Sequence, residues 1–318
     1  TSGQRNLLIG TEAGTNISTS DDNTAIGYNA MHGNDSTAGT GTGRNTGMGS
    51  SVLYAITTGQ QNVAIGTSAG STLTTTSHTV LIGHNAGLAI NSTDANGTVA
   101  IGMEAGKAIT SGASNVAIGY EALKTTTTGL RNIAIGYEAM HDTDAGSSSS
   151  DSDNNIFIGY TAGGGAWANA KSEFNVAIGS NVMQGVLNGA VYNSALGYFA
   201  LASVTSGDKN VAVGSEAGYA ITSATNNTFV GYQSGFALID GTSNTAMGML
   251  SLSTDCEDHN TAIGYYALKV CTSSDNTAVG AYAGDEITSG ERNTAVGHSA
   301  IGAAAGNSNT GIGFEALL

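Results

Sequence analysis

The chain has 318 residues and carries 9 Lys and Arg against 24 Asp and Glu, a formal net charge of −15. So acidic a chain lacks the basic side chains that bind nucleic acid or anionic membrane surfaces, and we expect neither partner. It contains no apolar run of about 18 residues that could form a membrane-spanning helix. Gly accounts for 47 residues and Pro is absent.

One short motif, Asn-(Thr/Val)-Ala-(Ile/Val)-Gly-x-x-Ala-(Gly/Leu/Met), recurs along the whole chain. Most copies are 16 or 17 residues apart, and Asn stands four residues before the glycine in sixteen of the eighteen copies, Thr79 and Thr98 being the exceptions. In chain order, the repeat glycines are Gly10, Gly27, Gly49, Gly66, Gly83, Gly102, Gly119, Gly136, Gly159, Gly179, Gly197, Gly214, Gly231, Gly248, Gly264, Gly280, Gly297 and Gly313.

Each copy predicts one short β-strand between its Asn and its Gly. The segment is β-branched and apolar, too short for a helix, and followed by a turn residue. One repeat cannot bury both faces alone, but stacked repeats bury them and complete the backbone ladder. We therefore expect an all-β parallel β-solenoid (β-roll) of about eighteen short coils, forming a single repeat domain over 1–318.

The repeat Asn and Gly residues have structural explanations. Gly at the corner supplies a positive φ or a close backbone approach, and Asn in register from coil to coil suits a side-chain amide ladder. A polar binding stripe is the less favoured interpretation. Clear examples of the pair are Asn23 and Gly27, Asn62 and Gly66, Asn115 and Gly119, Asn132 and Gly136, and Asn260 and Gly264.

The residue types of the strand also suggest assembly. We expect the Ile/Val face to be enclosed by the coil and the opposite face, carrying Ala residues such as Ala117, to pack against another chain. Uniformly small side chains permit close approach, so a self-associating bundle, most simply threefold, is predicted.

Three segments carry a family resemblance: Asn23 to Tyr28 (NTAIGY), Asn115 to Leu123 (NVAIGYEAL) and Asn260 to Tyr265 (NTAIGY). They resemble the head repeats of YadA-like trimeric adhesins. The Gly-Tyr-x-Ala-Leu form, joined by Thr/Ser/Gly linkers, more closely resembles repeats of bacteriophage tail fibres. The resemblance implies a left-handed parallel β-roll in a homotrimer.

The function that this resemblance implies is a structural and receptor-binding segment of a viral tail fibre, located on the virion and displaying loops to a host cell-surface glycan or protein. A bacterial trimeric surface adhesin head is the alternative. An ice-binding solenoid is a third hypothesis, because Thr occupies the first strand position in eight copies.

Longer insertions are the best candidates for receptor contact, because function tends to sit on loops that a rigid scaffold displays. They run, in chain order, over 33–44, 141–154 and 163–174, and the last contains the only tryptophan, Trp167. Candidate receptor-binding residues in and beside them are His141, Asp144, Tyr160, Trp167 and Phe174. A Tyr follows the repeat glycine in seven copies, which indicates surface cover or a sugar-stacking stripe.

Signals for chemistry are weak. The six His residues lack metal-ligand spacing, and the Gly-rich segments lack the Walker lysine, so we expect neither an enzyme nor a cofactor. Acidic residues such as Asp255, Glu257 and Asp258 could suit Ca²⁺, but solvated loops explain them better, and no metal site is predicted.

The two cysteines occupy nearly equivalent positions on successive coils: Cys256 lies eight residues after Gly248, and Cys271 seven after Gly264. Adjacent coils are about 4.8 Å apart, within the Cα separation that a disulfide needs. The spacing therefore predicts that Cys256 and Cys271 are close in space. A disulfide and two free thiols remain alternatives, because a reducing compartment would keep the thiols free.

Overall fold

The computed structural model describes residues 3–17, 19–33, 43–143, 151–302 and 306–317. Contacts divide the chain into two compact units, Thr1–Lys171 and Ser172–Leu318. The described residues form eighteen strands of three residues each, all pairing in parallel, and one turn of 3₁₀ helix. The predicted all-β parallel solenoid is therefore confirmed. None of these segments contains a helix that could cross a bilayer.

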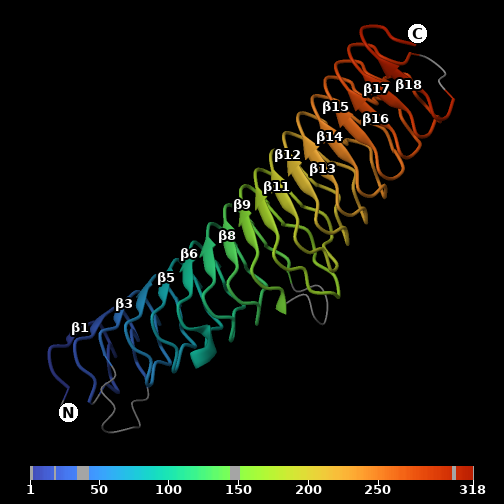
Figure 1. Cartoon of the computed structure of the whole chain (residues 1–318). Coiled ribbons are helices and arrows are strands. Elements are labelled where there is room, and N and C mark those ends of the chain that lie inside the picture. Colours follow the sequence, from blue (N-terminus) through green and yellow to red (C-terminus); the bar gives the residue numbers. More distant parts are fainter. Residues whose placement is uncertain (1–2, 18, 34–42, 144–150, 303–305, 318) are drawn as a thin grey trace. The chain divides into compact units, whose positions relative to one another are not determined.

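In the first unit, consecutive strands in the sequence are neighbours in the sheet (Figure 1). The elements are β1 (Leu7–Ile9), β2 (Thr24–Ile26), β3 (Thr46–Met48), β4 (Val63–Ile65), β5 (Val80–Ile82), η1 (Thr93–Ala95), β6 (Val99–Ile101), β7 (Val116–Ile118), β8 (Ile133–Ile135) and β9 (Ile156–Ile158). The register never slips, even where repeats differ in length: Thr24 faces Thr46 and Ile133 faces Ile156.

The second unit repeats this arrangement. Its strands are β10 (Val176–Ile178), β11 (Ser194–Leu196), β12 (Val211–Val213), β13 (Thr228–Val230), β14 (Thr245–Met247), β15 (Thr261–Ile263), β16 (Thr277–Val279), β17 (Thr294–Val296) and β18 (Thr310–Ile312). Equivalent residues again face one another, as Ala195 faces Ala212. Each coil thus pairs with the coils before and after it within the unit, which is the arrangement of a solenoid.

The orientation of the strands differs from the sequence prediction. The middle strand residue, usually Ala, points into its own coil and is buried, with Ala117 at 0% exposure, whereas the first and third residues point outward. A coil of 16 or 17 residues leaves little interior space, and corner residues such as Leu123 and Ile109 already occupy it. Only a small side chain fits beside them. The expectation that Ala faces another chain and Ile/Val is enclosed was wrong.

Larger middle residues are matched by a glycine. Where Phe229 replaces Ala, a Cβ on Gly235 would collide with the phenyl ring, and Gly163 stands in the same relation to Phe157. In other coils the middle residue is Ala and a Leu fills the position of that glycine, as with Ala117 and Leu123. In these coils the interior is therefore filled from one of the two positions, and where both are small, as with Ala100 and Gly106, Ile109 reaches the corner glycine instead.

The repeat glycine is required at its corner. At Gly119 φ is +135°, and a Cβ there would overlap the carbonyl oxygen of Gly136 on the next coil. The left-handed backbone and the close approach of successive coils both exclude other residues. Both sequence explanations for the glycine are confirmed.

The asparagines form the predicted ladder. Oδ1 of Asn193 accepts hydrogen bonds from the backbone N–H and the Nδ2 of Asn210, at 3.0 and 3.1 Å. The Nδ2 of Asn210 also donates to the carbonyl of Ala224 at 2.8 Å, on the next coil, where Ala224 stacks on Gly207. These side chains are 0% exposed, so each satisfies backbone groups that would otherwise be buried without partners. The structural interpretation of the asparagines is confirmed.

Candidate functional site

The outward strand face is made by the first and third residues of each strand, and its third residues form a column of exposed apolar side chains. On β10 and β11 the third residues are Ile178 and Leu196, which are 38% and 50% exposed and lie directly opposite each other in the ladder. The column continues in register with Val213 on β12. Exposed third-position residues elsewhere in the two units are Ile9, Met48, Ile65, Met247, Ile263 and Ile312.

A column of tyrosines borders this face. Tyr120, Tyr137 and Tyr160, each directly after a repeat glycine, stack with ring centroids 5.1 and 5.3 Å apart and planes 11° from parallel. The hydrogen bond to Glu121 raises the pKa of Tyr120. Tyr160, a candidate for receptor contact, is 56% exposed. Because these rings cover one another, the column presents mostly ring edges.

His141 belongs to a network of charged side chains on adjacent coils. Its Nε2 lies 2.8 Å from Glu121, whose other neighbour, Lys124, lies 2.9 Å away. Lys124 also reaches Glu104, which pairs with Lys107 at 2.9 Å. The hydrogen bond from Lys107, opposed by partial burial and supported by Lys124, lowers the pKa of Glu104 to about 2. The network ties three coils together, so His141 has a structural partner.

Trp167 was expected on the surface, but it lies in the core at 0% exposure. Its ring packs against Phe157 with centroids 5.6 Å apart, and its Nε1 donates to the carbonyl of Gly163 at 2.9 Å. The enlarged coil that follows β9 needs a large apolar side chain to fill its interior. In this conformation Trp167 is not accessible to a receptor, and its selection as a contact residue is corrected.

The remaining candidates do not join Trp167 in a single site. Phe174 is 42% exposed and stacks on Tyr192 at 5.1 Å in the second unit. Asp144 lies outside the described residues, as do parts of the predicted loops 33–44 and 141–154. The four candidates that the structure describes fall in separate environments and form no common receptor site.

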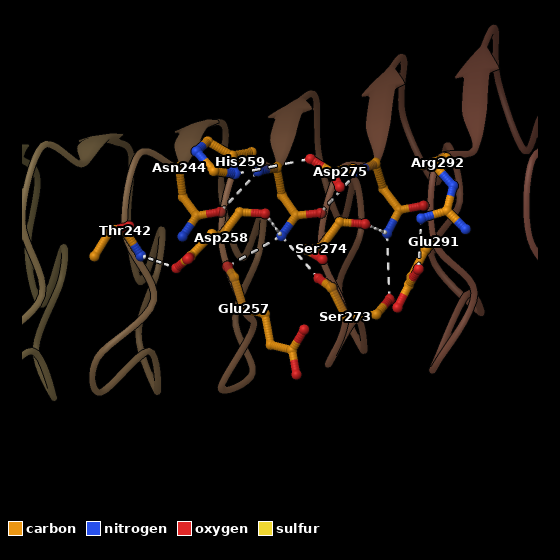
Figure 2. Close-up of polar contacts among 12 residues, drawn as sticks. Thr242, Asn244, Glu257, Asp258, His259, Ser273, Ser274, Asp275, Glu291 and Arg292 are labelled. Atoms are coloured by element: carbon orange, nitrogen blue, oxygen red, sulfur yellow. Dashed lines mark hydrogen bonds and ion pairs between the residues drawn. The ribbon is translucent and has the colours of Figure 1, made fainter.

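Acidic side chains near the asparagine column bond to the backbone of the preceding coil. Asp258 accepts a hydrogen bond from the backbone N–H of Thr242 at 2.7 Å, and His259 lies 3.7 Å from Asp275 (Figure 2). Asp255 accepts in the same way from Ile239. In the described segments no group of three His, Cys, Asp or Glu is arranged to hold a metal ion. Asp255 and Asp258 thus satisfy backbone N–H groups of the preceding coil.

Cys256 and Cys271 are buried free thiols. Both sulfur atoms approach the carbonyl oxygen of Ser273, at 3.2 and 3.4 Å, so both point into the coil interior. The hydrogen bond with Cys271, together with burial, raises the pKa of Cys256. The two side chains are neighbours, and the structure contains no bond between them.

The sequence reasoning missed a second aromatic column, five residues after the repeat glycine. In it His32 stacks on Tyr54 at 5.1 Å and Tyr219 on Phe236 at 5.2 Å. The equal offset from the glycine was the available signal, but most members of the column are not aromatic. A comparison with known protein families and with curated proteins finds no match for this chain.

Proposed function

We propose that the chain is a structural and receptor-binding segment of a viral tail fibre, which assembles with copies of itself, most simply as a homotrimer, and displays surface side chains to a host cell-surface receptor. The proposal follows the resemblance of the repeats to those of bacteriophage tail fibres. The single observation that carries it is the outward strand face, where apolar side chains such as Ile178, Leu196 and Val213 are exposed in register on consecutive strands.

A long apolar column is unfavourable in water and typically marks an association surface. Burial of apolar area there would stabilise an assembly by about 25 cal/mol per Å². A second copy of the same chain is the best occupant, because its own regular column of Ile, Val and Leu matches the spacing of about 4.8 Å between coils. This assigns self-association to the Ile/Val side of the strands, in place of the Ala side that the sequence suggested.

Assembly can be tested by substituting one outward residue. Leu196→Lys should shift the protein from a trimer to a monomer in sedimentation velocity, because the interface would bury an unpaired charge. Val186→Lys is the matched control, since Val186 is 49% exposed but lies outside the strand face. A wild-type chain that sediments as a monomer would remove the assembly proposal.

The location of the chain, on a virus particle or on a cell envelope, tests the proposed tail-fibre function. Antibodies against the chain should label the tail of virus particles in electron microscopy, and the purified chain should compete with those particles for adsorption to host cells. Labelling of a bacterial envelope instead would favour the adhesin alternative, which the same strand face would equally serve. Binding to neither would contradict both.

A further inference from the structure

The ring of Tyr54 has one covered face and one open face. His32, on the preceding coil, covers the first face with its ring 15° from parallel and its centroid 5.1 Å away. The equivalent residue on the following coil is Ser71, and the two coils stack directly, because the N–H of Ala55 donates to the carbonyl of Ser71 at 3.0 Å. A serine is too small to cover a phenol ring, and Tyr54 remains 41% exposed.

A shallow, open recess of about 430 Å³ lies at this place. It is lined by Tyr54 and Ala55 together with Asn29, Ser51, Ser68, Ser71 and Thr72. Tyr219 in the same column differs, since its ring stacks on Phe236 and is also met edge-on by Phe199. Tyr54 is thus distinguished by its small neighbour.

The lining of the recess is polar and uncharged. Three serine hydroxyls can each donate and accept a hydrogen bond. Thr72 adds a fourth hydroxyl to the lining, whereas the Oδ1 atom of Asn29 is buried beneath it. An ionic ligand would find no charged partner here, so its desolvation would be uncompensated. The chemistry fits a neutral ligand with several hydroxyl groups and one apolar face.

We propose that this recess is a saccharide subsite that takes a neutral hexopyranose ring. The C–H groups on one face of the sugar lie against the open face of Tyr54, whose π face is negative, and the sugar hydroxyls bond to the serine and threonine hydroxyls of the lining. The inference rests on the proposed function and deepens it, because it assigns the host receptor to the glycans.

Saturation-transfer NMR on the full chain tests the subsite, with the methyl glycosides of glucose, galactose, mannose and N-acetylglucosamine as probes. At least one should bind, with saturation concentrated on the C–H protons of one ring face. Tyr54→Ala should weaken binding at least tenfold, whereas Tyr54→Phe, which keeps the ring, should retain it. Ser71→Phe should also abolish binding, because a second ring would stack on Tyr54 as Phe236 does on Tyr219.

Tyr219→Ala is the matched control, since it removes a ring of the same column that already contacts two other rings and should leave sugar binding unchanged. Circular dichroism and the melting temperature establish that each variant is folded. If Tyr54→Ala does not fold, Ser71→Phe tests the subsite in its place. The proposal is overturned if none of the four glycosides binds, or if binding survives both Tyr54→Ala and Ser71→Phe. Assembly and virion labelling are measured separately, so a failure of the proposed function is distinguishable from a failure of the subsite.

Discussion

The phenyl ring of Phe229 occupies the space that a side chain at Gly235 would need. Phe229 is 0% exposed, and Gly235 has φ +64° at the corner after the same strand. In the coil of β7, Ala117 and Leu123 divide the same interior in the opposite way, with Leu123 at φ +52°. One volume is thus filled either from the strand or from the corner.

This exchange predicts a compensating pair. Phe229→Ala should lower the free energy of unfolding by about 3–5 kcal/mol because it leaves a cavity, and Gly235→Leu should prevent normal packing of the ring. The double variant should recover much of the loss, because it recreates the Ala117 and Leu123 arrangement. Urea unfolding of the four proteins gives the coupling energy. Additive losses in the double variant would contradict the exchange.

The asparagine ladder predicts that the same substitution has very different effects on stability at two neighbouring positions of the repeat, the ladder Asn and the residue before it. Asn210→Asp replaces two N–H donors with a carboxylate facing the oxygens of Asn193 and Ala224, and should destabilise the protein by about 3–5 kcal/mol. Asn226→Asp, on an exposed corner where Asp22 and Asp275 occur naturally, should change little. Thermal unfolding distinguishes the two, and similar melting temperatures would show that the ladder contributes little.

Trp167 should matter for folding, with no direct contact to a receptor. Trp167→Ala should destabilise the first unit by about 3–5 kcal/mol, and Trp167→Phe by less, since it keeps contact with Phe157 but loses the bond to Gly163. Both folded variants should adsorb to host cells normally at low temperature. A folded Trp167→Phe protein that fails to adsorb would return this residue to the receptor site.

Stability should fall in acid through Glu104. Its pKa is lowered to about 2 by Lys107 and Lys124 against the opposing effect of partial burial, below the ordinary value of 4.5. The stabilisation is therefore fully present above pH 4.5 and is lost as the pH falls toward 2. Glu104→Gln should flatten this part of the profile, and Lys107→Gln should move the carboxyl titration, followed by NMR, to higher pH. A titration of Glu104 unaffected by Lys107→Gln would exclude the pair as the cause.

The fold could be predicted because each repeat of the sequence forms one coil, so the period of the sequence is also the period of the parallel strand ladder. Asn and Gly recur at each corner because the side-chain amide can bond to the backbone and because Gly tolerates a positive φ, and both properties are known from the residue type. The direction of the strand faces could not be predicted in the same way, because both faces are apolar and only the interior volume of a coil decides which is enclosed. Beside a corner leucine such as Leu123, a small residue such as Ala117 fits inside the coil and an Ile or Val does not.

Surface sites were harder to predict for a related reason. Trp167 stood out by rarity, yet rarity also marks a residue that fills an unusual coil. Tyr54 did not stand out, because its column contains residues as different as His32, Ser71 and Leu88. Whether a face of the Tyr54 ring is open depends on the size of the side chains on the neighbouring coils. Those neighbours are known only from the three-dimensional stacking of the coils.

Thr24 and Thr46 face each other in the ladder although 22 positions separate them, and Ile133 and Ile156 do so across 23. The strands on either side of these two longer repeats keep the register of their neighbours. Doubling the length of a connection costs only about 0.6 kcal/mol in closure entropy. Natural variants should therefore be able to gain or lose residues at these two places without loss of fold. Sequence divergence among related chains should be concentrated in these segments, while the asparagine and glycine columns stay constant.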